Sequence, residues 1–166
     1  METSKELLSF MNKHQWGGSG IERCLFEFIV NMITRGSNIV EFGSGFCSTP
    51  ALSQISNVYS IDNNPQYIHH FKNVNYILAN IQDNWYNREI VKNFLPKKYE
   101  LVLVDGPVGS DYRSGILNNL DIFVDCKYII HDTYRDSEKI LAQNIAQKLN
   151  KQITFYTSGD YWAFIE

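Results

Sequence analysis

The stretch NIVEFGSGFCST, residues 38–49, decides the fold because it passes from a strand-like run into a glycine turn and then toward a helix. Gly43 and Gly45 allow the backbone to bend sharply, and they let a ligand approach where a Cβ atom would otherwise stand. Ser48 and Thr49 follow with hydroxyl groups that can cap the start of a helix. A strand, a glycine turn and a helix in this order predict an α/β sheet with a nucleotide-type ligand site at the strand end.

Four further short apolar runs follow, and each ends in or beside a polar or acidic residue. They are NVYSID (57–62), VNYILAN (74–80), YELVLVDG (99–106) and KYIIHD (127–132). The segments that are compatible with helices lie before, between and after these runs, at 21–35, 48–56, 65–72, 87–95, 111–125 and 135–150. Strands that are buried on both faces and separated by crossover helices form a parallel, doubly wound sheet.

The C-terminal segment has a different pattern. QITFYT (152–157) and YWAFIE (161–166) have the composition of strands, and the turn SGD between them is short enough for a hairpin. The predicted fold is therefore α/β and Rossmann-like: a mainly parallel sheet with a C-terminal antiparallel hairpin and helices on both faces. This plan resembles that of the class I S-adenosylmethionine-dependent methyltransferases. We predict a single domain, 1–166, with an N-terminal helical segment at 1–37 and the Rossmann-like core at 38–166.

The composition limits the classes of function. The 166 residues are 44% hydrophobic, enough for a sizeable core, and the formal net charge of -3 lacks the basic character of nucleic-acid-binding proteins. No apolar run reaches the roughly 20 residues that span a bilayer, and the three cysteines form no C-x-x-C pair. We therefore expect a cytoplasmic protein with a small-molecule or glycan substrate and with neither a nucleic-acid nor a membrane partner. A homo-oligomer stays open.

Acidic and glycine residues at the first two strand ends predict the ligand. In such sheets, ligands bind at the carboxyl ends of the strands. The acidic-x-Gly-x-Gly pattern led by Glu41 is similar to the first motif of class I methyltransferases, whose glycines lie against the methionine part of S-adenosylmethionine. Asp62 ends the second run, where its two oxygens can accept from both ribose hydroxyls. The alternative is structural, with a tight turn at Gly43 and Gly45 and a second turn that Asp62 opens.

Two loops add weaker signals. In ANIQDNW (79–85), Asp83 could meet an adenine amino group and is counted with the cofactor residues, while Trp85 could stack on the ring. A solvated loop is the alternative. WGGSG (16–20) could close over the carboxylate of the donor with its backbone N–H groups. It could equally be a connector in which Ser19 caps the next helix.

The fourth and fifth runs end in Asp105 and in His131-Asp132, which this topology brings beside the first strand. Methyl transfer needs an acceptor lone pair aimed at the methyl carbon and, for a hydroxyl acceptor, a group that takes the proton. These three residues are predicted to be catalytic, because a histidine titrates in the range required of a base. The carboxylates Asp105 and Asp132 could instead hold Mg²⁺ or Mn²⁺. The structural interpretation of His131 is a core histidine, hydrogen-bonded at a strand end.

Two segments, VDGPVGSDYRSGI (104–116) and IIHDTYRDSEKILAQNI (129–145), resemble the glucuronoxylan 4-O-methyltransferases and related polysaccharide methyltransferases. The shared pattern is a strand that ends in Asp, a Pro-x-Gly turn, an arginine and a later His-Asp-x-x-Arg-x-x-Glu segment. The matching residues are Asp105, Gly106, Pro107, Gly109, Arg113, His131, Asp132, Arg135 and Glu138. The resemblance implies methyl transfer to a sugar hydroxyl.

Three residues of these segments are predicted to contact the substrate. Arg113 and Arg135 could pair with an acidic group, and Tyr134 could form an aromatic wall of the kind that sugars favour. In the structural alternatives, Arg113 pairs with Asp105 or Asp111 within the fold, and Arg135 forms an i,i+3 pair with Glu138.

The combined prediction is an S-adenosylmethionine-dependent O-methyltransferase that acts on a hydroxyl of a sugar or glycan. An NAD-dependent dehydrogenase is one alternative, but Ser48 stands where the dinucleotide motif has its third glycine. The other alternative is a non-catalytic module that binds the donor or a sugar within a glycan-modifying assembly.

Overall fold

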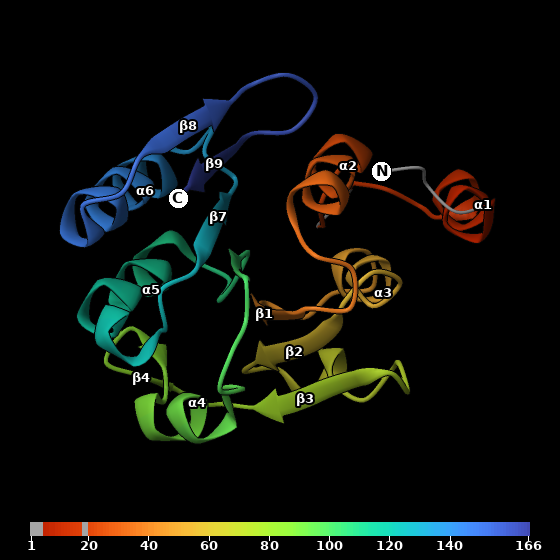
Figure 1. Cartoon of the computed structure of the whole chain (residues 1–166). Coiled ribbons are helices and arrows are strands. Elements are labelled where there is room, and N and C mark those ends of the chain that lie inside the picture. The colour runs from red at the N-terminus through yellow and green to blue at the C-terminus, as the bar shows by residue number, and fades with distance from the viewer. Residues whose placement is uncertain (1–4, 18–19) are drawn as a thin grey trace.

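A seven-stranded sheet in the order β3-β2-β1-β6-β7-β9-β8 forms the centre of the molecule (Figure 1). The computed structural model describes residues 5–17 and 20–166, apart from the side chains of residues 110 and 111. In sheet order the strands are Val74–Leu78, Asn57–Asp62, Asn38–Phe42, Leu101–Val104, Lys127–His131, Trp162–Ile165 and Ile153–Tyr156. β9 runs antiparallel to both β7 and β8, and the other neighbours are parallel. The predicted Rossmann-like α/β fold with its C-terminal hairpin is confirmed.

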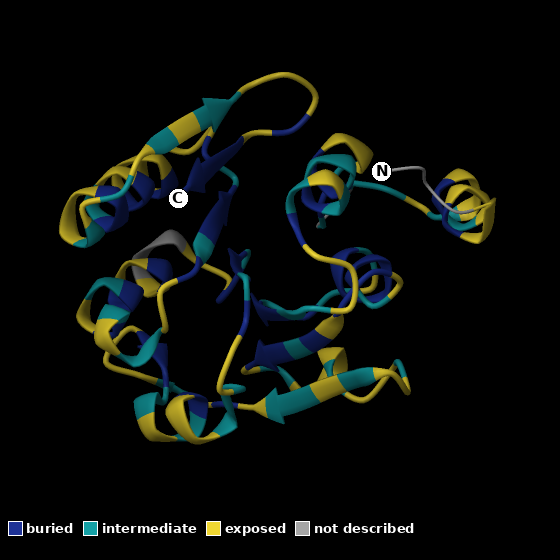
Figure 2. Ribbon diagram, in the orientation of Figure 1, coloured by how far each residue is buried: buried dark blue, intermediate teal, exposed yellow. Residues whose placement is uncertain are grey.

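Helices cover both faces of this sheet. One buried apolar cluster joins the sheet to α1 (Lys5–Lys13), α2 (Arg23–Met32) and α3 (Ser48–Leu52). The other joins it to α4 (Arg88–Phe94), η2 (Ser114–Asn118) and α6 (Asp136–Leu149). The inner strands β1, β2, β6, β7 and β9 are mostly buried between these layers, whereas the edge strands β3 and β8 are intermediate or exposed (Figure 2). Among the described residues, no helix is long and apolar enough to cross a membrane.

Three predicted helices are shorter than their sequence patterns suggested. The segment 48–56 is helical only in α3, and 65–72 forms a single 3₁₀ turn, η1 (Pro65–Tyr67). The segment 111–125 breaks into α5 (Ser110–Arg113), η2 and η3 (Leu120–Ile122). η1 has no buried residue, so no tertiary packing stabilises a longer helix there.

A small hairpin takes the place of the loop expected after β3. β4 (Ile81–Gln82) pairs antiparallel with β5 (Trp85–Tyr86). Asp83 and Asn84 form its turn with φ angles of 52° and 60°, a left-handed conformation that this residue type tolerates. Trp85 has no exposed surface, and its ring centroid lies 4.9 Å from that of Phe42. The predicted stacking of Trp85 on an adenine ring is therefore wrong.

The register of the parallel strands brings four strand ends to one edge of the sheet. Phe42 of β1 is level with Ile61 of β2 and with Val104 of β6, and Val104 is level with Ile130 of β7. The residues that follow these positions therefore emerge side by side. This edge carries the candidate site.

Candidate active site

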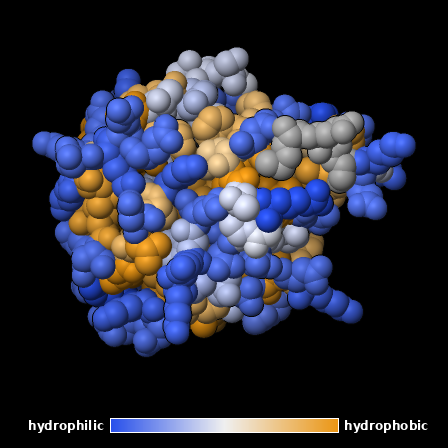
Figure 3. Space-filling view, in the orientation of Figure 1, coloured by the Kyte–Doolittle hydropathy of each residue, from blue (hydrophilic) through white to orange (hydrophobic). Residues whose placement is uncertain are grey.

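A cavity of about 740 Å³ opens at the carboxyl ends of β1, β2 and β6. This volume lies within the range of cofactor and small-molecule sites. Its walls come from the segment before α2 and from the loops after these strands, and they include Trp16, Gly43, Asp62, Ile81, Asp105 and Tyr112. Two residues of the predicted closing loop, Gly18 and Ser19, lie outside the described residues, and so does the predicted cap at Ser19. On the face shown in Figure 3, hydrophilic residues dominate the periphery and apolar residues gather between them.

Gly43 and Gly106 lie against each other in the cavity wall. A Cβ atom on Gly43 would stand 2.6 Å from the backbone nitrogen of Gly106, and one on Gly106 would stand 2.6 Å from the Cα of Gly43. Gly43 also has a φ of 94°, which an L side chain rarely adopts. The loops after β1 and β6 therefore meet through bare backbone.

Glu41 supports the glycine loop from inside the core. Its Oε2 accepts hydrogen bonds from Thr49 Oγ1 (2.7 Å) and Ser60 Oγ (2.6 Å). Thr49 Oγ1 in turn accepts from the backbone N–H of Gly45 (2.9 Å). Glu41 is completely buried and does not line the cavity, so its predicted direct contact with a cofactor is wrong. Burial outweighs these hydrogen bonds and raises the pKa of Glu41 to about 7.

Asp62 lines the cavity and is held by backbone groups. Its Oδ2 accepts from the N–H of Ser44 (2.9 Å), and its Oδ1 accepts from the N–H of Asn64 (2.7 Å). Burial raises the pKa of this carboxyl despite those bonds. The structure thus fixes the orientation of the carboxylate that the sequence predicts to bind a ribose.

Asp83, also predicted to contact the cofactor, lies outside the cavity wall. It is exposed in the turn of the β4–β5 hairpin, whereas Ile81 of the same hairpin lines the cavity.

The three residues predicted to be catalytic lie together, as expected from the strand order. Asp105 follows β6, His131 ends β7 and Asp132 comes next with a left-handed φ of 63°. His131 Nδ1 lies 2.9 Å from Asp105 Oδ1 and 3.5 Å from Asp132 Oδ1. Of the three, only Asp105 lines the cavity, and His131 is buried behind it.

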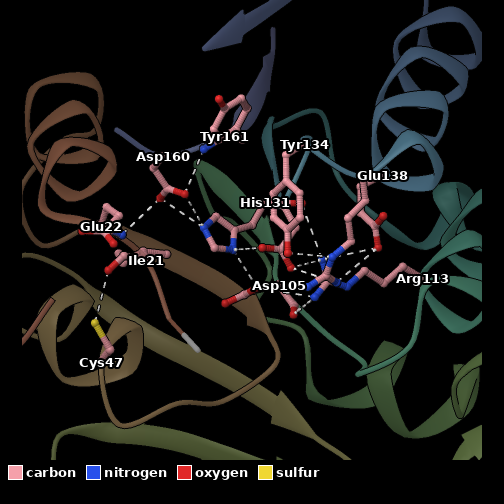
Figure 4. Close-up of polar contacts among 12 residues, drawn as sticks. Ile21, Glu22, Cys47, Asp105, Arg113, His131, Tyr134, Glu138, Asp160 and Tyr161 are labelled. Atoms are coloured by element: carbon pink, nitrogen blue, oxygen red, sulfur yellow. Dashed lines mark hydrogen bonds and ion pairs between the residues drawn. The ribbon is translucent and has the colours of Figure 1, made fainter. Parts of the chain in front are cut away.

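Sequence reasoning missed Asp160, which completes this cluster from the turn between β8 and β9. Asp160 Oδ1 lies 3.0 Å from His131 Nε2, so His131 stands between two carboxylates (Figure 4). Asp160 also accepts from the backbone N–H of Glu22, which precedes α2, and of Tyr161. The sequence signal that could have identified it is the aspartate of the SGD turn. Because β9 pairs with β7, with Trp162 opposite His131, a residue just before β9 comes close to His131.

The two carboxylates fix the charge of His131. Burial disfavours an imidazolium, but the hydrogen bonds with Asp105 and Asp160 outweigh it and raise the pKa of His131 to about 10. The same contact outweighs burial at Asp160 and lowers the pKa of that carboxyl. His131 is therefore protonated near neutral pH, which corrects the expectation of a neutral histidine base.

Arg113 is buried beneath the cluster instead of facing a substrate. Only 4% of it is exposed, and its guanidinium donates to the backbone carbonyls of Asp105, Pro107 (3.3 Å) and His131 (3.5 Å). Its Nη1 also lies 3.2 Å from Asp132 Oδ2. The predicted contact of Arg113 with an acidic substrate is wrong, and its pairing within the fold is correct.

Tyr134 and Arg135 lie on the surface beside the cluster. Tyr134 is 58% exposed, and its ring stands edge-on to that of Tyr161 with centroids 6.0 Å apart. Arg135 Nη1 lies 3.2 Å from Asp132 Oδ2, and the guanidinium carbon lies 5.1 Å from the centroid of the Tyr134 ring. Both side chains are accessible, so their predicted contact with a substrate stays a prediction.

Comparison with known proteins connects this geometry to one fold. No protein-family model and no curated protein matches the chain, but solved structures are similar to it. The precorrin-6y C5,15-methyltransferase of Geobacter metallireducens superposes with a TM-score of 0.62 at 10% identity, over 93% of this chain and 92% of that one. The chain has the class I methyltransferase fold.

Two further structures place the chain in the same fold. A TehB-like S-adenosylmethionine-dependent methyltransferase of Corynebacterium glutamicum superposes with a TM-score of 0.56 at 14% identity, over 84% of each chain. The MycE methyltransferase of mycinamycin biosynthesis, in complex with Mg and S-adenosylhomocysteine, superposes with a TM-score of 0.62 at 12% identity. That match covers 97% of this chain and 52% of MycE.

Proposed function

We propose that this protein is an S-adenosylmethionine-dependent O-methyltransferase that acts on a hydroxyl of a sugar or glycan. The observation that carries the proposal is the cavity itself. The glycine loop, Asp62 and Asp105 all line it. A donor-binding carboxylate and a proton-accepting carboxylate thus face one space of about 740 Å³.

The donor side fits S-adenosylmethionine by its shape and its chemistry. Gly43 and Gly45 keep Cβ atoms out of the wall, and Asp62 presents carboxylate oxygens to the cavity for two ribose hydroxyls. Glu41 would hold the loop without touching the ligand, through Thr49 and Ser60. When bound there, the donor supplies an electrophilic methyl group.

Asp105 is the residue best placed to manage the acceptor. Its Oδ1 is held by His131 Nδ1, which donates as an imidazolium. The carboxylate can therefore accept a hydrogen bond from the substrate hydroxyl and orient the oxygen lone pair toward the methyl group. Asp105 would take the hydroxyl proton as the substrate oxygen forms its bond to the methyl carbon, while the S–CH₃ bond breaks and S-adenosylhomocysteine leaves. His131 acts as a fixed donor that orients Asp105, and Asp160 holds His131.

A sugar acceptor is supported by the surface next to Asp105. Three exposed aromatic side chains, Tyr112, Tyr134 and Tyr161, stand on the segments that carry the acidic cluster or beside them, and aromatic faces suit sugar rings. The resemblance to polysaccharide methyltransferases over 104–116 and 129–145 points to the same acceptor class. The structurally similar enzymes are named for acceptors as different as a precorrin and a mycinamycin, so the fold leaves the acceptor to be tested.

Ligand stabilisation tests the donor site. We expect S-adenosylmethionine and S-adenosylhomocysteine, each well above its Kd, to raise the Tm by about 5 °C or more. Asp62→Ala should remove this shift, whereas Asp121→Ala, at an exposed ion pair far from the cavity, should keep it. If neither compound raises the Tm of the wild type, the proposed function is wrong. A shift with NAD alone would favour a dehydrogenase.

Label transfer tests the acceptor. The protein is incubated with methyl-labelled donor and a panel of neutral and acidic oligosaccharides, with phenolic and amine acceptors for comparison. Label on a sugar hydroxyl is the expected result. Label on an amine or phenol alone contradicts the acceptor class, and binding of S-adenosylhomocysteine without transfer to any acceptor would favour a non-catalytic donor-binding module.

A further inference from the structure

Asp105, His131 and Asp132 form a group that resembles a metal site. Each offers one nitrogen or oxygen atom, and these atoms lie within 4.8 Å of one another. Carboxylate oxygens are the ligands that Mg²⁺ and Mn²⁺ prefer, and the sequence predicts a divalent cation at Asp105 and Asp132. The contacts of each member decide whether such an ion fits.

Both carboxylates already face cations of the protein. Asp132 Oδ2 lies 3.2 Å from Arg113 Nη1 and 3.2 Å from Arg135 Nη1. Asp105 Oδ1 lies 2.9 Å from His131 Nδ1 and 3.5 Å from Arg113 Nη2. A guanidinium keeps its proton in proteins and offers no acceptor, so these contacts are permanent counter-charges.

Both ring nitrogens of His131 already contact carboxylates. Its Nδ1 faces Asp105 Oδ1, and its Nε2 faces both carboxylate oxygens of Asp160 at 3.0 and 3.1 Å. Both ring nitrogens are therefore already in hydrogen-bond contact with carboxylates of the protein. A metal at His131 would have to displace one of these contacts.

Arg113 cannot easily move away from this position. Three backbone carbonyls from the ends of β6 and β7 accept from its guanidinium, and Glu138 Oε1 lies 3.8 Å from its Nη1. The side chain is 4% exposed. A divalent ion bound to Asp105 and Asp132 would lie beside this buried positive charge, where little solvent screens the repulsion.

We propose that Arg113, with Arg135, occupies the electrostatic position that a divalent cation would take, so that this acidic cluster works without a metal. Arg113 is then a positioning residue. It holds the carboxylates of Asp105 and Asp132 at the two strand ends, and it does not touch the acceptor. The consequence for methyl transfer rests on the function proposed above, whereas the exclusion of the cation can be tested without any transfer.

Binding of Mn²⁺ to the full chain, followed by electron paramagnetic resonance and calorimetry, is the primary test. The wild type should bind no detectable Mn²⁺ at concentrations up to about 1 mM. Only a very weak site, with a Kd well above about 1 mM, would stay empty there. Arg113→Met keeps a long side chain but removes the positive charge that lies beside Asp105 and Asp132. This variant should bind one Mn²⁺ at least about 10-fold more tightly than the wild type. Arg135→Met should tighten binding less, and Arg88→Met, at a distant exposed ion pair, should resemble the wild type.

The outcomes separate clearly. Stoichiometric binding of Mn²⁺ by the wild type that is lost in Asp132→Asn overturns the proposal. A folded Arg113→Met that binds no Mn²⁺ also overturns it, because the arginine would then not be what keeps the cation out. If circular dichroism shows that Arg113→Met does not fold, Arg135→Met replaces it, since that side chain is 41% exposed, and a failure of this variant to bind Mn²⁺ more tightly than the wild type counts against the proposal in the same way.

Activity gives a second readout that distinguishes this proposal from the proposed function. Transfer of label by the wild type should be the same with and without EDTA. Transfer that EDTA abolishes and Mn²⁺ restores would overturn the proposal while leaving the methyltransferase function intact. The Mn²⁺ measurements keep their meaning even if S-adenosylhomocysteine fails to stabilise the protein and the proposed function is abandoned.

Discussion

The two sides of the cavity hold their carboxylates in different ways. On the side of β1 and β2, Glu41 and Asp62 accept from hydroxyls and backbone N–H groups, and burial raises the pKa of both. On the side of β6 and β7, Asp105 and Asp132 face the cations Arg113 and His131. The first arrangement suits a neutral, hydroxyl-rich part of a ligand. The second places the carboxylate that lines the cavity, Asp105, against positively charged groups of the protein.

Asp105→Asn should have the largest effect of the changes that probe this difference. It removes the carboxylate that lines the cavity on the β6 side, so we expect methyl transfer to fall about 1000-fold. The rise in Tm with S-adenosylhomocysteine should survive, because the residues of the β1–β2 side are unchanged. Label transfer and thermal unfolding measure the two quantities. Parallel loss of both would show that the two sides are one functional unit.

Gly43→Ala should have the next largest effect. It changes the contact between the loop after β1 and the loop after β6. Its Cβ would stand 2.6 Å from the nitrogen of Gly106, in addition to the positive φ, and we expect a loss of about 3 kcal/mol in the free energy of unfolding. Gly36→Ala is the matched control. Gly36 has a φ of 82° but no atom within 4 Å of the added carbon, so only about 1 kcal/mol should be lost. Equal losses in urea unfolding would show that the backbone contact is relaxed easily.

Asp160→Asn probes the ionic side through the pH dependence of stability. His131 has a folded pKa of about 10, above its ordinary 6.5, so its stabilising contribution is complete below pH 6.5 and is lost as the pH rises through 10. The variant should lose about 2 kcal/mol at pH 6, and the difference from the wild type should shrink above pH 10. Urea unfolding at pH 6, 8 and 10.5 measures this. A difference that is constant over that range would contradict the ion pair.

Glu41→Gln, on the donor side, should stabilise the protein, whereas Asp160→Asn destabilises it. The folded pKa of about 7 lies above the ordinary 4.5, so the stability associated with Glu41 is complete below pH 4.5 and is lost as the pH rises through 7. The neutral variant should therefore gain about 2 kcal/mol in free energy of unfolding relative to the wild type between pH 5 and pH 8. An unchanged difference between these pH values would show that Glu41 has the same charge at both.

The sequence was sufficient for the fold and for the meeting of Asp105, His131 and Asp132. The alternation of strands and helices predicts a parallel sheet, the resemblance to the class I methyltransferases implies its strand order, and parallel pairing brings the strand ends to one edge. The number of residues that separate Asp105 from His131 and Asp132 in the chain plays no part in this prediction. The placement of Asp62 at the cavity follows from the same rule.

The parts that could not be predicted depend on where long or buried side chains point. Nothing in the spacing of Arg113 shows that its guanidinium turns inward to the carbonyls of both strand ends instead of outward to a substrate. Asp160 reaches His131 only because β9 runs back along β7, a tertiary contact across nearly thirty positions of sequence. Trp85 and Asp83 were misplaced because a two-residue strand has too little pattern to detect.

The bare contact between Gly43 and Gly106 also bears on the order in which ligands bind. A side chain between the two loops could absorb a small displacement, but two backbones in contact transmit it, since protein interiors are close-packed. A ligand that settles on the loop after β1 therefore also sets the position of the loop after β6, which carries Asp105. The donor would then have to arrive first, and the acceptor would meet a finished site only afterwards. Such a sequence of arrival would appear as a compulsory-order pattern in initial-rate and product-inhibition kinetics.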